Sequence, residues 1–96
     1  MSENERALVV RVTGRVQGVG YRAWTQGEAE RLGVHGWVVN RDEGHVDAVF
    51  VGPGDRLGEL LGLCREGPSA ATVDHVDARS IDRCAATEPP PGALSF

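Results

Sequence analysis

The stretch of the chain best suited to chemistry is Gly14-Arg15-Val16-Gln17-Gly18-Val19-Gly20-Tyr21-Arg22. It lies between an apolar run, Leu8 to Val12, and a run with helical spacing, Ala23 to Leu32. Glycines let the backbone N–H groups of such a loop converge, and the N-terminus of the following helix adds partial positive charge. The guanidinium of Arg22 adds a full charge in a planar fork that matches phosphate oxygens. The segment therefore indicates a loop that binds phosphate.

Composition narrows the possible mechanisms. The chain has 96 residues, enough for one domain with its own core, and its 41% hydrophobic and 25% charged residues are typical of globular proteins. The net charge of −4 argues against a general nucleic-acid binder. All ten basic residues are arginine, which excludes a P-loop lysine, a Schiff base and a Ser–Lys nucleophile.

Features that the sequence lacks predict where the protein is located and the state of its two cysteines. No apolar run approaches the ~20 residues of a membrane span, so we expect no membrane association. The segment Met1 to Ala7 is polar and resembles neither a signal nor a transit peptide, so we expect a cytoplasmic protein. Cys64 and Cys84 have no metal-binding spacing and are expected to be buried thiols.

The elements that must position the loop follow from hydrophobic periodicity. Alternation predicts strands over 7–13, 36–41, 45–51 and 72–83, and Asp42-Glu43-Gly44 is typical of a hairpin turn. Helical spacing predicts one helix over 22–32, ending at Gly33, and a second that Asp55 caps and Gly67-Pro68 ends. The order βαββαβ predicts an α+β sandwich, with an antiparallel sheet and two helices on one face.

Three details of packing are also predicted. Trp24, Ala29 and Leu32 should form the inner stripe of the first helix, and Gly27 should mark a close contact on it. The segment 86–96 should be a proline-rich connector followed by a short tail, Ala93 to Phe96, that could form a scrap of strand.

Two segments of the sequence closely resemble the signatures of the acylphosphatases. The first is GRVQGVGYR, residues 14–22, and the second is GWVVNRDEGHVDAVFVG, residues 36–52. The resemblance covers about residues 7–85 and implies a ferredoxin-like βαββαβ fold, so that residues 1–96 form a single domain. It implies hydrolysis of acyl phosphates to a carboxylate and inorganic phosphate, with no metal and no cofactor.

The resemblance also implies roles for individual residues. Arg22 and Asn40 would be catalytic: Arg22 would bind the substrate phosphate and Asn40 would position the attacking water. The phosphate would also be held by the backbone amides of Gln17, Gly18, Val19, Gly20, Tyr21 and Arg22.

The sequence departs from the family pattern at two places. Val39 stands where relatives usually have lysine, arginine or another longer side chain, and we expect it to change packing or charge at the rim of the site. The chain ends at Phe96, where relatives usually continue through a last short strand. This leaves less material to hold Arg22 in place.

The implied reaction fits these residue types. The leaving group is a carboxylate whose parent acid has a pKa of ~4–5, so it leaves without a proton donor. The transition state of phosphoryl transfer is loose, and catalysis is mostly positioning and charge stabilisation. The carbonyl oxygen of Asn40 can accept a hydrogen bond from water, and the sequence holds no compelling cluster of metal ligands.

Other functions also fit parts of this sequence. A ferredoxin-like module that binds phosphate or carbamoyl phosphate without turnover stays open, as does Asn40 acting as a simple turn former. Residues 18–23 also fit G-x-G-x-x-A, but no acidic residue follows at the ribose position. An RNA-binding sheet needs exposed aromatic residues and basic charge, which this composition lacks. We therefore expect a monomer whose partner is a small-molecule acyl phosphate, with no nucleic acid and no membrane.

Overall fold

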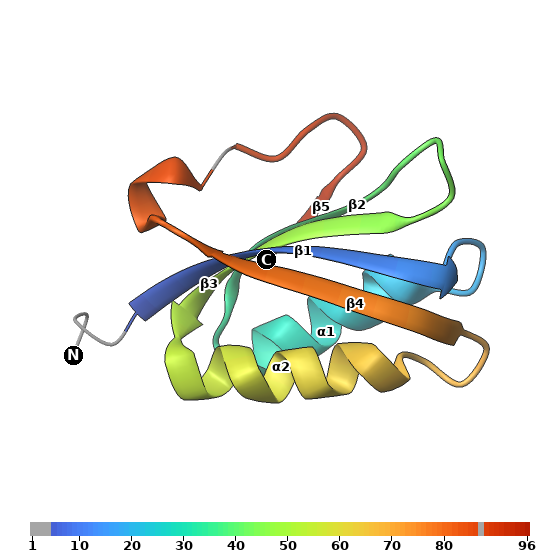
Figure 1. The fold of residues 1–96 in the computed structure, drawn as a ribbon, viewed down its shortest axis with the longest axis horizontal. Coiled ribbons are helices and arrows are strands. Elements are labelled where there is room, and N and C mark those ends of the chain that lie inside the picture. Colours follow the sequence, from blue (N-terminus) through green and yellow to red (C-terminus); the bar gives the residue numbers. More distant parts are fainter. Residues whose placement is uncertain (1–4, 87) are drawn as a thin grey trace.

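The computed structural model, which describes residues 5–86 and 88–96, is a five-stranded sheet with two helices packed on one face (Figure 1). The sheet order is β4-β1-β3-β2-β5, and every neighbouring pair is antiparallel. The predicted ferredoxin-like βαββαβ order is confirmed. In chain order the elements are β1 (Glu5–Arg15), α1 (Tyr21–Leu32), β2 (His35–Asn40), β3 (Val46–Pro53), α2 (Gly54–Glu66), β4 (Thr72–Ile81), a short 3-10 helix (Arg83–Ala85) and β5 (Leu94–Ser95).

The main core lies between the sheet and the helices. Alternate residues of β3, such as Val46, Ala48 and Phe50, point toward the helices because side chains alternate across a strand. From the helices, the buried residues are Tyr21, Thr25, Ala29, Leu32, Leu57, Leu60 and Cys64. The opposite face carries a smaller cluster of Trp37, Val39 and Val49, against which Ala86 and Ala93 pack. The expectation of a buried thiol is therefore confirmed for Cys64, whereas the side chain of Cys84 lies outside the described residues.

The first helix differs from its prediction in three ways. It starts at Tyr21, one residue early, and Tyr21 and Thr25 are buried at positions that the predicted stripe omitted. Trp24 is only partly buried and packs at the edge of the core. Gly27 is exposed, and a side chain there would meet no atom within 4 Å, so the predicted close contact is wrong. Because Tyr21 sets the buried face of the helix, the helical repeat places Gly27 on the face toward solvent.

The ends of other helices and strands also differ from their predictions. Helix α2 has Pro53 at its N-cap with no side-chain cap, so Asp55 does not cap the helix but lies in its first turn. A carboxylate in that turn still interacts favourably with the helix dipole. The fourth strand ends at Ile81 because the chain then enters the 3-10 helix. Gly33 and Gly44 have positive φ, as the predicted helix stop and hairpin turn require.

The C-terminal tail is a strand of the sheet. Leu94 and Ser95 pair with Val38 and Trp37 of β2, and Phe96 exchanges two backbone hydrogen bonds with Gly36. The expected scrap of strand is confirmed: β5 is two residues long and lies along the edge of β2. Its partner strand was not predicted, because local composition carries no signal for a partner so distant along the chain.

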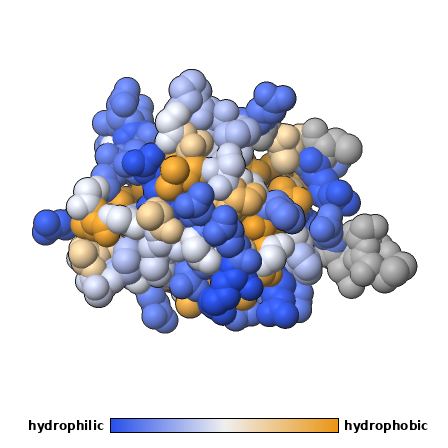
Figure 2. All heavy atoms as spheres, turned by 180° about the vertical axis from the view of Figure 1, so that it is seen from behind, coloured by the Kyte–Doolittle hydropathy of each residue, from blue (hydrophilic) through white to orange (hydrophobic). Residues whose placement is uncertain are grey.

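The molecular surface is mixed in character. Seen from behind, hydrophobic side chains form small patches separated by hydrophilic ones (Figure 2), as is normal for protein surfaces. Within the described residues, neither helix is long and apolar enough to cross a bilayer.

Gly14 provides a test of the β1–β4 contact. Its φ is +124°, and a Cβ there would lie 2.3 Å from the carbonyl oxygen of Thr72. We expect Gly14→Ala to lower the free energy of unfolding by about 2–3 kcal/mol. Gly27→Ala is the matched control, since it should raise stability by roughly 0.5–1 kcal/mol through helix propensity. Urea denaturation measures both, and equal stabilities of the Gly14 variant and the wild type would contradict the close approach.

Candidate active site

The loop between β1 and α1 is built to leave backbone donors free. Gly18 and Gly20 have φ values of 74° and 80°, a region that residues with a Cβ rarely adopt. Gly20 is the N-cap of α1 and supplies no side chain to cap it. Among the described residues, the backbone N–H groups of residues 17–22 have no hydrogen-bond acceptor. Free N–H groups at a helix N-terminus attract anions.

A small cavity of about 190 Å³ lies against this loop. Its walls come from the loop, the first turn of α1, the end of β2 and the strand β5. The lining residues are Val16, Gly18, Gly20, Tyr21, Arg22, Ala23, Asn40 and Leu94. The structure thus brings together Arg22 and Asn40, the two residues predicted to be catalytic, with three residues of the predicted phosphate loop. Gln17 and Val19 belong to the loop but do not line this cavity.

Asn40 is the last residue of β2 and lies on the helix side of the sheet. Trp37 and Val39 pack on the opposite face, as the predicted alternation requires. Within the described residues, the buried Oδ1 of Asn40 has no hydrogen-bond donor. Such an atom is rare in folded proteins because an unsatisfied buried acceptor costs about 1–3 kcal/mol. Its presence beside Arg22 marks the cavity as a place where a further donor fits.

Arg22 is oriented by the C-terminal segment. Its Nη1 donates a hydrogen bond to the carbonyl of Gly92 at 2.8 Å, and Gln26, one turn later, donates to the carbonyl of Ser95 at 2.9 Å. We expected less material to hold Arg22, and the C-terminal segment supplies one partner for its guanidinium, the backbone carbonyl of Gly92. No described carboxylate lies within 4.0 Å of this guanidinium, so its charge is not compensated.

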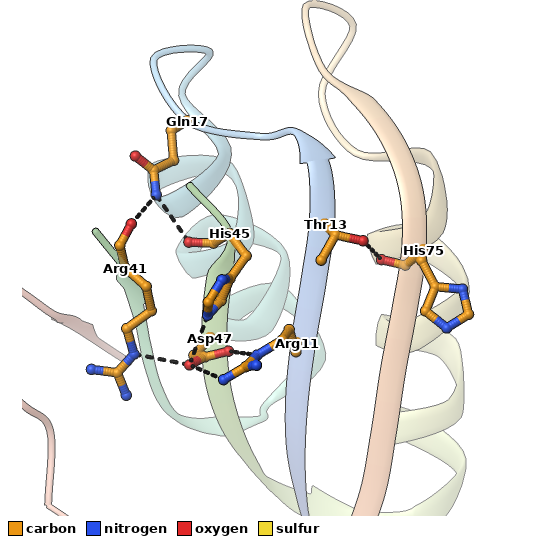
Figure 3. A network of polar contacts seen from close by, with 7 residues as sticks. All are labelled: Arg11, Thr13, Gln17, Arg41, His45, Asp47 and His75. Atoms are coloured by element: carbon orange, nitrogen blue, oxygen red, sulfur yellow. Dashed lines mark hydrogen bonds and ion pairs between the residues drawn. The ribbon is translucent and has the colours of Figure 1, made fainter. Parts of the chain in front are cut away.

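The side chain of Gln17 has a role that its place in the loop did not reveal. Its Nε2 donates to two carbonyls of the β2–β3 hairpin, that of Arg41 at 2.7 Å and that of His45 at 2.9 Å (Figure 3). These bonds tie the loop to the turn that directly follows Asn40. An amide placed between glycines in a tight loop was the available signal, since such side chains often bond to nearby backbone.

Tyr21 lines the cavity while its phenol points into the core. The side chain is buried, and its hydroxyl donates to the carbonyl of Cys64 at 2.7 Å. Burial raises the pKa of this phenol above its ordinary value, and burial also raises the pKa of the Cys64 thiol, to about 11. Neither group therefore supplies an anion near neutral pH. Val39 is buried against Trp37 and Val49, so its departure from the family pattern changes packing on the far face of the sheet.

A larger cavity, of about 440 Å³, lies on the face of the sheet away from the helices. It contains none of the residues predicted for the site. Its polar walls are Arg11, Arg41, Asp47, Asp77 and Arg79. The smaller cavity is the candidate active site because it holds Arg22, Asn40 and the free loop amides.

Asp47 organises the polar side of that second face. It accepts hydrogen bonds from Nε of Arg11 at 3.0 Å and Nε of Arg41 at 2.9 Å, and Nε2 of His45 lies 3.5 Å away. Burial alone would raise the pKa of Asp47, but the two guanidinium hydrogen bonds outweigh it and hold the pKa below its ordinary value of 3.8. Asp47 was not predicted as a functional residue, although a carboxylate within an otherwise apolar strand indicates a polar partner there. Among the described residues, no three His, Cys, Asp or Glu side chains group as metal ligands.

Tyr21→Phe tests where the phenol points. The change removes the hydrogen bond from the phenol to the carbonyl of Cys64, so the free energy of unfolding should fall by about 1–1.5 kcal/mol. Because the hydroxyl faces Cys64 and not the cavity, affinity for inorganic phosphate should stay the same. Thermal denaturation and a phosphate titration measure the two effects, and a loss of phosphate affinity would place the hydroxyl in the site.

The lowered pKa of Asp47 predicts a pH dependence of stability. A carboxylate with a depressed pKa contributes stability that is complete above its unfolded value and is lost as pH falls through the folded pKa. The stability difference between wild type and Asp47→Asn should therefore be constant above about pH 5 and shrink below pH 3.8. Urea denaturation from about pH 2.5 to about pH 7, a range that brackets this window, measures it. A difference that does not vary with pH would show that the carboxylate has no special stabilisation.

Known proteins resemble this chain in sequence and in structure. The sequence matches the family described as Acylphosphatase over residues 8–87. An acylphosphatase from Nitrobacter hamburgensis is 51% identical over 81 residues, which cover 84% of this chain and 80% of that protein. The structure of an acylphosphatase from Coxiella burnetii aligns with a TM-score of 0.82 at 34% identity, over 95% of this chain and 92% of that one.

A third comparison concerns the fold alone. Full-length HypF in its phosphate- and nucleotide-bound form aligns with a TM-score of 0.78 at 21% identity, over 88% of this chain and 11% of that one. The family match spans both the loop that carries Arg22 and the strand that ends in Asn40. The chain belongs to the acylphosphatase family.

Proposed function

We propose that this chain hydrolyses acyl phosphates to a carboxylate and inorganic phosphate, with Arg22 and Asn40 as its catalytic residues. The observation that carries the proposal is the meeting, at one cavity, of three groups that can take a further hydrogen-bond partner or a counter-charge. These are the free backbone N–H groups of the loop, the uncompensated guanidinium of Arg22 and the buried Oδ1 of Asn40. The first two suit a phosphate, and the third suits a water.

The proposed step is a displacement at phosphorus. The substrate phosphate accepts hydrogen bonds from the amides of residues 17–22 and from Arg22, which offset its negative charge. A water that donates to Oδ1 of Asn40 attacks phosphorus. The bond between phosphorus and the acyl oxygen breaks, the carboxylate leaves with the electron pair, and the proton of the water passes to a phosphate oxygen.

The alternative is a module that binds phosphate or carbamoyl phosphate without turnover. The fold likeness to HypF, a structure described as phosphate-bound, fits phosphate binding but does not require hydrolysis. Oδ1 of Asn40 favours hydrolysis, because the ionised oxygens of a bound phosphoryl group accept hydrogen bonds, whereas a water beside them can donate one to this oxygen. The remaining expectations stay predictions: the protein is a cytoplasmic monomer with a single domain, and it binds no metal, cofactor or nucleic acid.

The experiment is hydrolysis of a synthetic aryl acyl phosphate with a chelator present. We expect wild-type turnover to persist in the chelator and kcat/KM to fall by about 10²-fold or more in Arg22→Ala and in Asn40→Ala. Arg31→Ala is the matched control, because Arg31 lies on the same helix and pairs with Glu28 at the surface. Its activity should equal that of the wild type.

The two variants also separate hydrolysis from binding. Arg22→Ala should weaken inhibition by inorganic phosphate, whereas Asn40→Ala should lower kcat and leave phosphate inhibition nearly unchanged. Full activity in Arg22→Ala would overturn the proposal. Phosphate binding without any wild-type turnover would establish the binding module instead.

A further inference from the structure

We propose that Asp47 is a positioning residue for the active site, acting from the opposite face of the sheet through Arg41, the β2–β3 hairpin and Gln17. The inference rests on the proposed function, because it assigns Asp47 the task of holding the phosphate loop and Asn40 in register. Asp47 itself does not touch the candidate cavity.

Asp47 is built into the sheet and not onto its surface. It is 8% exposed and sits between β1 and β2, where Arg11 and Val39 are its neighbours in register. Arg11 reaches it with two hydrogen bonds, from Nε at 3.0 Å and Nη2 at 3.3 Å. Arg41 reaches it from the hairpin with one, at 2.9 Å. The carboxylate, on the central strand β3, therefore links the turn after β2 to the neighbouring strand β1.

The hairpin carries this link to the active site. Arg41 and His45 close the turn, since the N–H of Arg41 donates to the carbonyl of His45 at 2.9 Å. The carbonyls of the same two residues accept the hydrogen bonds from the Gln17 side chain. Arg41 is thus held at its guanidinium by Asp47 and at its carbonyl by Gln17 (Figure 3). Asn40 is the next residue toward the N-terminus, so whatever fixes Arg41 also fixes Asn40.

The negative charge of Asp47 holds the guanidinium groups of Arg11 and Arg41 near each other. Removing the carboxylate leaves the guanidinium groups of Arg11 and Arg41 close together with no anion between them. Like charges repel, so Arg41 would turn outward toward solvent. The carbonyls that Gln17 uses lie on the residues that would move. A contrasting pair on the same sheet, His75 and Asp77, is exposed and bonds to neither the loop nor the hairpin.

A double-mutant cycle on the full chain tests the inference. It compares wild type, Asp47→Asn, Gln17→Ala and the double variant. The measurements are kcat/KM for the acyl phosphate, the dissociation constant for inorganic phosphate from an NMR titration, and the melting temperature. We expect Asp47→Asn to weaken phosphate binding about three- to tenfold when Gln17 is present and less than about twofold when it is absent. Asp74→Asn, at an exposed carboxylate of β4, is the matched control and should change none of these values.

Arg41→Met keeps the test valid if Asp47→Asn does not fold. It leaves the pair of Asp47 and Arg11 intact and removes only the tether to the hairpin. Phosphate binding should weaken in the same direction, with the same dependence on Gln17. A purely structural role for Asp47 would instead lower the melting temperature equally in both Gln17 backgrounds without changing phosphate affinity.

The outcomes separate the two proposals. Phosphate affinity that changes by less than about twofold in both Asp47→Asn and Arg41→Met overturns the positioning role, as do equal losses in both Gln17 backgrounds. If the wild type binds phosphate but does not turn over, the proposed hydrolysis fails while the phosphate titration still decides the role of Asp47. A wild type that neither binds phosphate nor turns over overturns both.

Discussion

The site depends on the two hydrogen bonds from the Gln17 amide to the carbonyls of Arg41 and His45. The loop and the hairpin are more than twenty residues apart in sequence, and each alone is a flexible turn. One side chain with two donors bridges them, which no hydroxyl can do. Because Asn40 precedes the hairpin and Arg22 follows the loop, this bridge fixes how far apart the proposed water-positioning and phosphate-binding groups lie.

Much of this arrangement was predictable from the sequence. Alternation in 45–51 and the spacing of Leu57, Leu60 and Cys64 gave the sheet and the second helix, since burial of one face leaves a period in the sequence. The glycines of the loop and Arg22 predicted an anion site because backbone freedom and charge are local properties. Pairing Asn40 with Arg22 required the family resemblance, since nothing local links two residues in separate elements.

What was missed depends on contacts distant in sequence. A short strand at 93–96 was foreseen, but its partner was not, because Gly36 and Trp37, which pair with Phe96 and Ser95, are distant in sequence. Trp24 was assigned to the core by helical spacing, yet Tyr21 is buried more deeply, and its hydroxyl donates to the carbonyl of Cys64. Asp47 was overlooked because its partners, Arg11 on β1 and Arg41 in the hairpin turn, are not evident from its own strand.

The C-terminal segment changes how Arg22 should be understood. A carbonyl partner such as that of Gly92 orients a guanidinium without neutralising it, whereas a carboxylate would orient it and compete with phosphate for it. Asp47 shows the opposite arrangement, in which the guanidinium groups of Arg11 and Arg41 are committed to a carboxylate. Arg11 and Arg41 thus commit their charge to a carboxylate at the hairpin. Arg22, bound to a carbonyl, keeps its charge for an incoming anion.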